Sequence, residues 1–101
     1  MEKNNEQKID IELPLEVSAG VYSNLQLITH SQTEFILDFI QIMPGVPKAQ
    51  VRSRVILAPQ HAKRLLYALK DNIAKYEQQN GTITEQEQSP MPYQINSMGQ
   101  A

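Results

Sequence analysis

The side chains that could carry chemistry in this chain are few and lie far apart. Of its 101 residues two are histidines and none is a cysteine, which excludes disulfides, thiolate nucleophiles and thiolate metal sites. A metal bound by His30 and His61 would need at least one further ligand, and Glu34 and Asp38 are the candidates near His30. We interpret both histidines as surface or capping residues and expect no metal site.

Asp38 is the carboxylate with the most unusual surroundings in the sequence. It shares one face of an apolar strand with Ile36 and Ile40, where an unpaired charge is costly to bury. Arg52 and Arg54 alternate onto a single face of the next predicted strand. A cross-strand pair between Asp38 and an arginine is therefore the structural interpretation. A catalytic carboxylate is the alternative, and it lacks a second acid or base within evident reach.

The short motifs that mark phosphate, acyl-transfer or zinc chemistry are absent from the sequence. We find no Gly-rich phosphate loop, no G-x-S-x-G elbow and no H-E-x-x-H. Only four glycines are present, which leaves little material for a phosphate cradle. We therefore expect no catalytic residue, no cofactor and no enzymatic activity.

The net charge of −2 argues against a dedicated nucleic-acid-binding protein, but the charge is unevenly distributed. Residues 1–16 carry five acidic and two basic side chains, whereas residues 17–80 carry four acidic and seven basic ones. This mildly basic centre supports a hypothesis of single-stranded nucleic-acid binding, in which Tyr22 provides a stacking surface. The basic contacts in that hypothesis are Arg52, Arg54 and Lys63.

The period of the apolar residues predicts the elements that would position these side chains. Four segments read as strands: residues 9–13, 21–30, 33–43 and 49–57. Pro59 suits the first position of a helix, and apolar residues then recur at the helical period until Asn80-Gly81. We therefore predict an α+β fold. It consists of an antiparallel three- to four-stranded β-meander followed by one amphipathic C-terminal helix, in the order β-β-β-β-α.

The two ends of the chain differ in composition from this centre. Residues 1–8 are polar, and residues 82–101 are rich in Gln, Ser, Pro and Gly. We expect both ends to be disordered and residues 9–81 to form a single domain, with a short docking motif as the alternative for the tail. The lack of a long apolar run, of an apolar leader segment and of cysteine favours a cytoplasmic location with no membrane partner.

The predicted strand at residues 33–43 is apolar on both faces, which a single helix cannot cover. Phe35, Leu37 and Phe39 share one face. We expect the opposite face to be an interface in a homodimer or higher oligomer. Its residues are Ile36, Asp38, Ile40 and Ile42. The alternative is that residues 9–13 fold over this face within the same chain.

Residues 21–81 also resemble a known family. The similarity lies in the segment from His30 to Phe39 and in PQHAKRLL at residues 59–66, which leads into Asn72-Ile73 and Tyr76-Glu77. This pattern resembles the bacterial family called domain of unknown function 3467. Ala58 departs from it, because the family commonly has a serine before the proline. The resemblance implies a small bacterial protein of uncharacterised function and supplies no mechanism.

Two hypotheses for function follow. The first is a non-enzymatic, homo-oligomeric protein–protein interaction module, which could also bind extended segments of another protein at a sheet edge. The second is a single-stranded nucleic-acid-binding module that uses the basic sheet face. Binding that weakens steeply as salt rises would favour the second.

Overall fold

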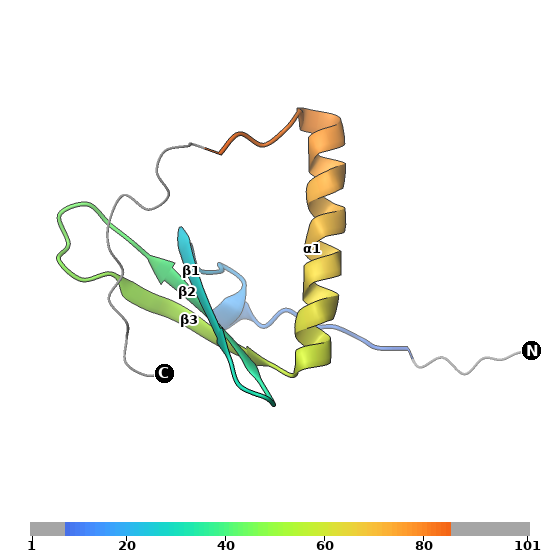
Figure 1. Ribbon diagram of the computed structural model, residues 1–101, viewed down its shortest axis with the longest axis horizontal. Helices are drawn as coiled ribbons and strands as arrows, with labels where there is room; N and C mark the ends of the chain where they lie inside the picture. Colours follow the sequence, from blue (N-terminus) through green and yellow to red (C-terminus); the bar gives the residue numbers. More distant parts are fainter. Residues whose placement is uncertain (1–7, 86–101) are drawn as a thin grey trace, which may run out of the picture.

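The computed structural model describes residues 8–85, which contain three strands and one long helix (Figure 1). The elements are η1, a short 3-10 turn (Leu15–Val17), then β1 (Leu25–His30), β2 (Phe35–Gln41), β3 (Gln50–Leu57) and α1 (Pro59–Asn80). The strands form one antiparallel sheet in the order β1-β2-β3. The predicted α+β fold, a meander followed by one C-terminal helix, is confirmed.

The register of the sheet divides its side chains into two faces. Leu37 of β2 lies between Ile28 and Val55, whereas Asp38 lies between Leu27 and Arg54. Paired residues of neighbouring strands point to the same side, and successive residues alternate. Leu37 and Asp38 therefore belong to opposite faces, which we call the Leu37 face and the Asp38 face. β3 accommodates a register shift opposite Phe39 and Ile40.

Side chains before β1 pair with β2 and shorten the strand relative to its predicted start at residue 21. The Asn24 Nδ2 donates to the Ile42 carbonyl at 3.1 Å, and the Ile42 N–H donates to Asn24 Oδ1 at 2.8 Å. The Ser23 hydroxyl donates to the Ile40 carbonyl at 3.1 Å. Asn24 thus continues the pairing of β1 with β2 through its side-chain amide and through its backbone N–H, which donates to the Ile40 carbonyl at 3.0 Å.

The loop between β2 and β3 is set by a tight turn at Met43–Val46. The Val46 N–H donates to the Met43 carbonyl at 3.2 Å, and Gly45 has φ +81°. Proline at the second and glycine at the third position are the residues that a type II turn requires. The turn at Met43–Val46 therefore explains the Pro44-Gly45 pair in the sequence.

Residues 9–13, which we predicted as a first strand, have no strand partner among residues 8–85. Ile9, Ile11 and Leu13 keep 78%, 89% and 68% of their surface exposed. In Figure 1 this segment runs from η1 past the base of α1 and away from the sheet. The fourth strand of the prediction is therefore not formed within the single chain. We predicted disorder at residues 1–8 and 82–101, and of these, residues 1–7 and 86–101 lie outside the described residues.

Helix α1 begins directly after β3 without a capping side chain. Ala58 occupies the N-cap position in extended conformation, with φ −66° and ψ 155°, and Pro59 follows at the first helical position. The methyl group of Ala58 cannot accept a hydrogen bond from the free N–H groups of the first turn. At the other end, the N–H of Gly81 donates to the Glu77 carbonyl at 3.0 Å with φ +88°, which closes the helix.

Replacing Ala58 with serine should therefore raise the free energy of unfolding by about 1 kcal/mol, because the hydroxyl can satisfy a free N–H of α1. Urea denaturation at one fixed protein concentration measures this change. Ala68→Ser, in the middle of α1, is the matched control and should lower stability by about 0.5 kcal/mol. An Ala58→Ser protein no more stable than the wild type would contradict the prediction.

Candidate functional site

Helix α1 exposes its entire apolar side to solvent. Five large apolar residues follow the helical period and share this side, and we call them the α1 stripe: Leu65, Leu66, Leu69, Ile73 and Tyr76. No residue of α1 is buried, and Leu66 and Leu69 still expose 55% and 54% of their surface. Most helices in proteins depend on packing of such a face for their stability. Within the single chain, no member of the α1 stripe is buried.

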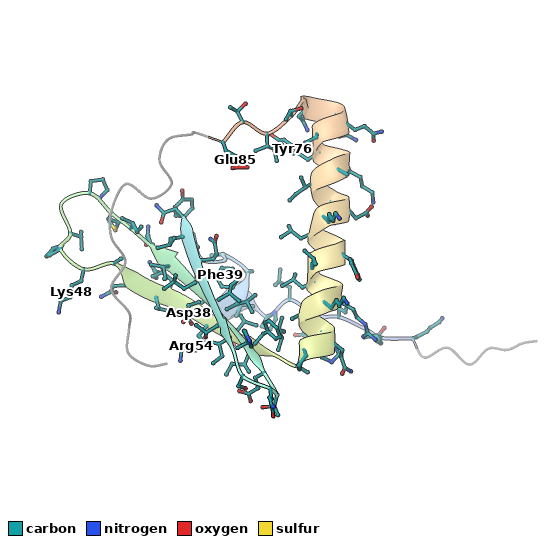
Figure 2. All side chains as sticks on the ribbon, viewed as in Figure 1. Asp38, Phe39, Lys48, Arg54, Tyr76 and Glu85 are labelled. Carbon is teal, nitrogen blue, oxygen red and sulfur yellow. The ribbon has the colours of Figure 1, made fainter. Side chains whose placement is uncertain are left out.

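The stripe is uncovered because α1 diverges from the sheet. The helix starts at the end of β3 and then rises away from the three strands (Figure 1). In Figure 2 Tyr76 lies on the side of α1 that faces the sheet, and Phe39 lies on the side of the sheet that faces α1. The α1 stripe and the Leu37 face are therefore turned toward one another without meeting along most of the helix.

The Leu37 face is itself only partly covered. Leu37 in the central strand is buried, but Ile28 and Val55, its neighbours on β1 and β3, remain exposed. Exposed apolar side chains therefore lie both on the α1 stripe and on this row of the sheet. We call the α1 stripe together with Ile28 and Val55 the inner surface. A surface of this kind marks an interaction site more often than it marks bare solvent contact.

The opposite face holds an ion pair between a buried carboxylate, Asp38, and a half-exposed arginine, Arg54 (Figure 2). Asp38 is 3% exposed, and Arg54 binds it through two hydrogen bonds: Nε donates to Oδ1 at 2.6 Å and Nη2 donates to Oδ2 at 2.9 Å. The hydrogen bonds from Arg54 lower the pKa of Asp38 below its usual range, and they outweigh the opposing effect of burial. The predicted cross-strand pair is confirmed, with Arg54 as the partner. The two hydrogen bonds satisfy one lone pair on each carboxylate oxygen of Asp38.

The residues that we predicted as an oligomer interface lie on this Asp38 face or just beyond its end. Asp38 and Ile40 are buried within the single chain, and Ile36 and Ile42 are half-buried. These four residues therefore offer less free apolar surface than the α1 stripe does. Their role in an interface stays a prediction.

The α1 stripe is the surface that sequence reasoning did not single out. Its signal was present, since the apolar residues of residues 59–81 recur at the helical period. We assumed that this side covers the sheet of its own chain. A period shows which residues share a face, but it carries no information about the angle at which the helix leaves the preceding strand.

The four residues of the nucleic-acid hypothesis do not form one surface. Arg52 and Arg54 lie on β3, Lys63 lies on α1, and Tyr22 lies in the segment leading into β1, at the other edge of the sheet. The Arg54 guanidinium is occupied by Asp38, and Arg52 Nη1 donates to Gln41 Oε1 at 2.7 Å. The two arginines are thus held in place by other side chains of the sheet.

The histidines occupy positions that suit packing or solvent contact. The His30 ring stacks on Phe35 across the β1–β2 turn, with centroids 5.2 Å apart and planes 24° apart. His61 is exposed in the first turn of α1. Between residues 8 and 85 no group of three His, Asp or Glu side chains is placed to hold a metal ion. Nor does that part of the chain contain a helix long and apolar enough to cross a membrane.

Comparison with known proteins supplies a family for the chain. No curated protein matches it, and no solved structure matches it. The sequence does match the family described as "Protein of unknown function (DUF3467)" over residues 1–85. This range includes the segment before η1, the whole sheet and α1. The chain therefore belongs to the DUF3467 family.

Proposed function

We propose that this chain is a non-enzymatic, homo-oligomeric protein–protein interaction module whose primary partner is a second copy of itself. The observation that carries the proposal is the α1 stripe, five large apolar side chains on a helix without a single buried residue. A symmetric dimer would bury the same surface on both copies, which is the commonest way in which soluble proteins associate.

The free energy that a dimer gains depends on how much of the inner surface it buries. A large apolar side chain that already hides about half of its surface gains roughly 1 kcal/mol when the rest is buried. The two α1 stripes of a dimer then supply on the order of 10 kcal/mol, against about 8 kcal/mol for micromolar affinity. Association also costs rotational and translational freedom. The stripes alone are therefore insufficient, and we expect Ile28 and Val55 to be buried in the same interface.

Sedimentation equilibrium on the full-length protein tests this proposal. We expect a mass of twice the chain mass of 11.5 kDa or a higher multiple at about 10 µM, with dissociation only at lower concentration. A protein that sediments as a monomer up to about 100 µM would overturn the proposal, because the inner surface would then be stable in water.

Single-stranded nucleic-acid binding is the second candidate function. The excess of basic residues between 17 and 80, and the exposed Tyr22 and Lys63, favour it. The pairing of Arg54 with Asp38 reduces the charge available on β3. Titration of the protein with a mixed-sequence single-stranded DNA separates the two candidates. Binding that falls steeply with added salt would support this second function, and no binding at low salt would exclude it.

A further inference from the structure

We propose that residues 9–13 of each copy form the missing fourth strand on the free edge of β3 in a second copy, so that two chains exchange their N-terminal arms. We call residues 9–13 the arm. This inference rests on the proposed homo-oligomer and identifies a second element of its interface. The exchange explains why residues 9–13 have the sequence pattern of a strand but form no strand within the single chain.

The arm has the composition of a half-buried strand but the exposure of a segment without a partner. Ile9, Ile11 and Leu13 alternate with Asp10 and Glu12, yet the three apolar side chains remain 68–89% exposed. Among the described residues, no backbone hydrogen bond ties the arm to the sheet. Alternation of this kind is satisfied only when one face is covered and the backbone is paired.

The sheet offers two free edges, and charge selects one of them. β1 and β3 each pair with β2 on one side only. Unpaired N–H and C=O groups along such an edge can accept another strand. β1 carries no acidic, lysine or arginine side chain, whereas β3 carries Arg52 and Arg54. Arg54 is already paired with Asp38, but Arg52 is hydrogen-bonded to the uncharged Gln41 amide, so the two carboxylates of the arm fit the edge of β3 better than that of β1.

The alternation of the arm also matches that of β3. Val55 and Leu57 lie on the Leu37 face, and Arg54 lies on the Asp38 face. When the isoleucines of the arm continue the Leu37 face, Asp10 and Glu12 fall on the Asp38 face beside Arg54. A shift by one residue would place both acids on the Leu37 face, away from Arg54, so charge favours this alignment. The hydrophobic pattern does not decide it, because Val51 and Ile56 of β3 are exposed on the Asp38 face.

The connection of the arm to its own sheet favours a second copy as the acceptor. The arm is joined through η1 to β1, at the edge opposite β3. Within η1, the Val17 N–H donates to the Pro14 carbonyl and the Ser18 N–H donates to the Leu15 carbonyl, at 3.1 and 3.2 Å. In Figure 1 the segment before η1 extends from η1 away from the three strands and past α1 in this view.

Disulfide trapping tests the exchange directly, because the wild-type chain contains no cysteine. Full-length Ile11→Cys protein is mixed with an equal amount of protein carrying one cysteine on the Leu37 face of β3. The three β3 variants are Ser53→Cys, Val55→Cys and Leu57→Cys. Cysteines on adjacent strands lie within disulfide range only when they are nearly opposite. We expect one β3 variant to form the mixed disulfide at least about tenfold faster than the slowest one, as identified by peptide mass.

A matched control and two further outcomes decide the result. Gln26→Cys, an exposed position on the same face of β1, should react with Ile11→Cys no faster than the slowest β3 variant. Preferential reaction at Gln26→Cys would overturn the choice of edge. A protein that carries both Ile11→Cys and the reactive β3 cysteine provides a second test. If its disulfide forms within one chain and not between two chains, the exchange is overturned. If the protein sediments as an oligomer but all positions react equally slowly, the pairing of the arm with β3 is overturned and the proposed function is not. If the protein sediments as a monomer, the proposed function itself is overturned.

Discussion

Replacing Leu69 with glutamate is expected to convert the proposed oligomer to a monomer at micromolar concentration. Leu69 lies in the middle of the α1 stripe and is 54% exposed in the single chain. In a symmetric interface each copy would have to bury a carboxylate against apolar side chains, at a cost of several kcal/mol. Since each 1.4 kcal/mol changes affinity tenfold, we expect the dissociation constant to rise at least about 100-fold.

Tyr67→Glu is the matched control for this experiment. Tyr67 is 55% exposed, almost the same fraction as Leu69, but it lies on the opposite side of α1 from the stripe. Sedimentation equilibrium should give the wild-type mass for Tyr67→Glu and the monomer mass for Leu69→Glu. Retention of the oligomer by both variants would show that α1 does not form the interface. Leu69→Ser provides a milder change, should the charged variant lose its helical circular dichroism.

Removing Arg54 is expected to destabilise the protein more than removing Asp38. Asp38→Ala deletes the buried charge together with its two hydrogen bonds, and should lower the free energy of unfolding by about 2 kcal/mol. Arg54→Ala leaves the carboxylate buried without its partner, which is the costlier situation. Urea denaturation of the two variants at one protein concentration gives the comparison directly.

The same pair predicts a reversal in the pH dependence of stability. In the wild type the pKa of Asp38 is lowered by folding, so its stabilising contribution is complete above the unfolded pKa and is lost as pH falls through the folded one. In Arg54→Ala only burial remains, which raises the folded pKa, so stability should increase as pH falls from about 7 toward 4.

Arg52→Ala serves as the control in this series, because within residues 8–85 Arg52 is hydrogen-bonded to the Gln41 amide and not to a carboxylate. Its stability should follow pH as the wild type does. Equal destabilisation by Asp38→Ala and Arg54→Ala, with no difference in pH dependence, would mean that Asp38 is hydrated rather than dependent on Arg54.

The elements of this fold were predictable because each is marked by local chemistry. The predicted helix at residues 59–81 agrees with α1 because Pro59 and Gly81 have backbone requirements that do not depend on the rest of the fold. The strands agree less closely at their ends. Ser23 and Asn24 pair through their side chains, which the alternation of apolar residues does not reveal.

The candidate site also has a part that could be predicted from the sequence and a part that could not. The Asp38–Arg54 pair was predictable, since a lone carboxylate on an apolar strand needs a cation on the neighbouring strand. The exposure of the α1 stripe was not, because it depends on the direction in which α1 leaves β3. The strand pattern of residues 9–13 was readable, but the pattern alone does not say whether the segment pairs within its own chain, and in the single chain it forms no strand.

The Asp38–Arg54 pair has a consequence for the accuracy of folding. β2 is apolar on both faces, so sliding it by two residues along β3 would keep its side chains on their original faces and exchange one apolar contact for another. In one direction that slide would set Asp38 opposite Ile56 and leave the carboxylate buried without a cation. The buried, unpaired carboxylate would destabilise such a mispaired hairpin, whereas the apolar contacts would be about equally favourable in both alignments. The ion pair thus favours the correct register of β2 with β3. Without it, we expect misaligned and aggregation-prone sheets to persist.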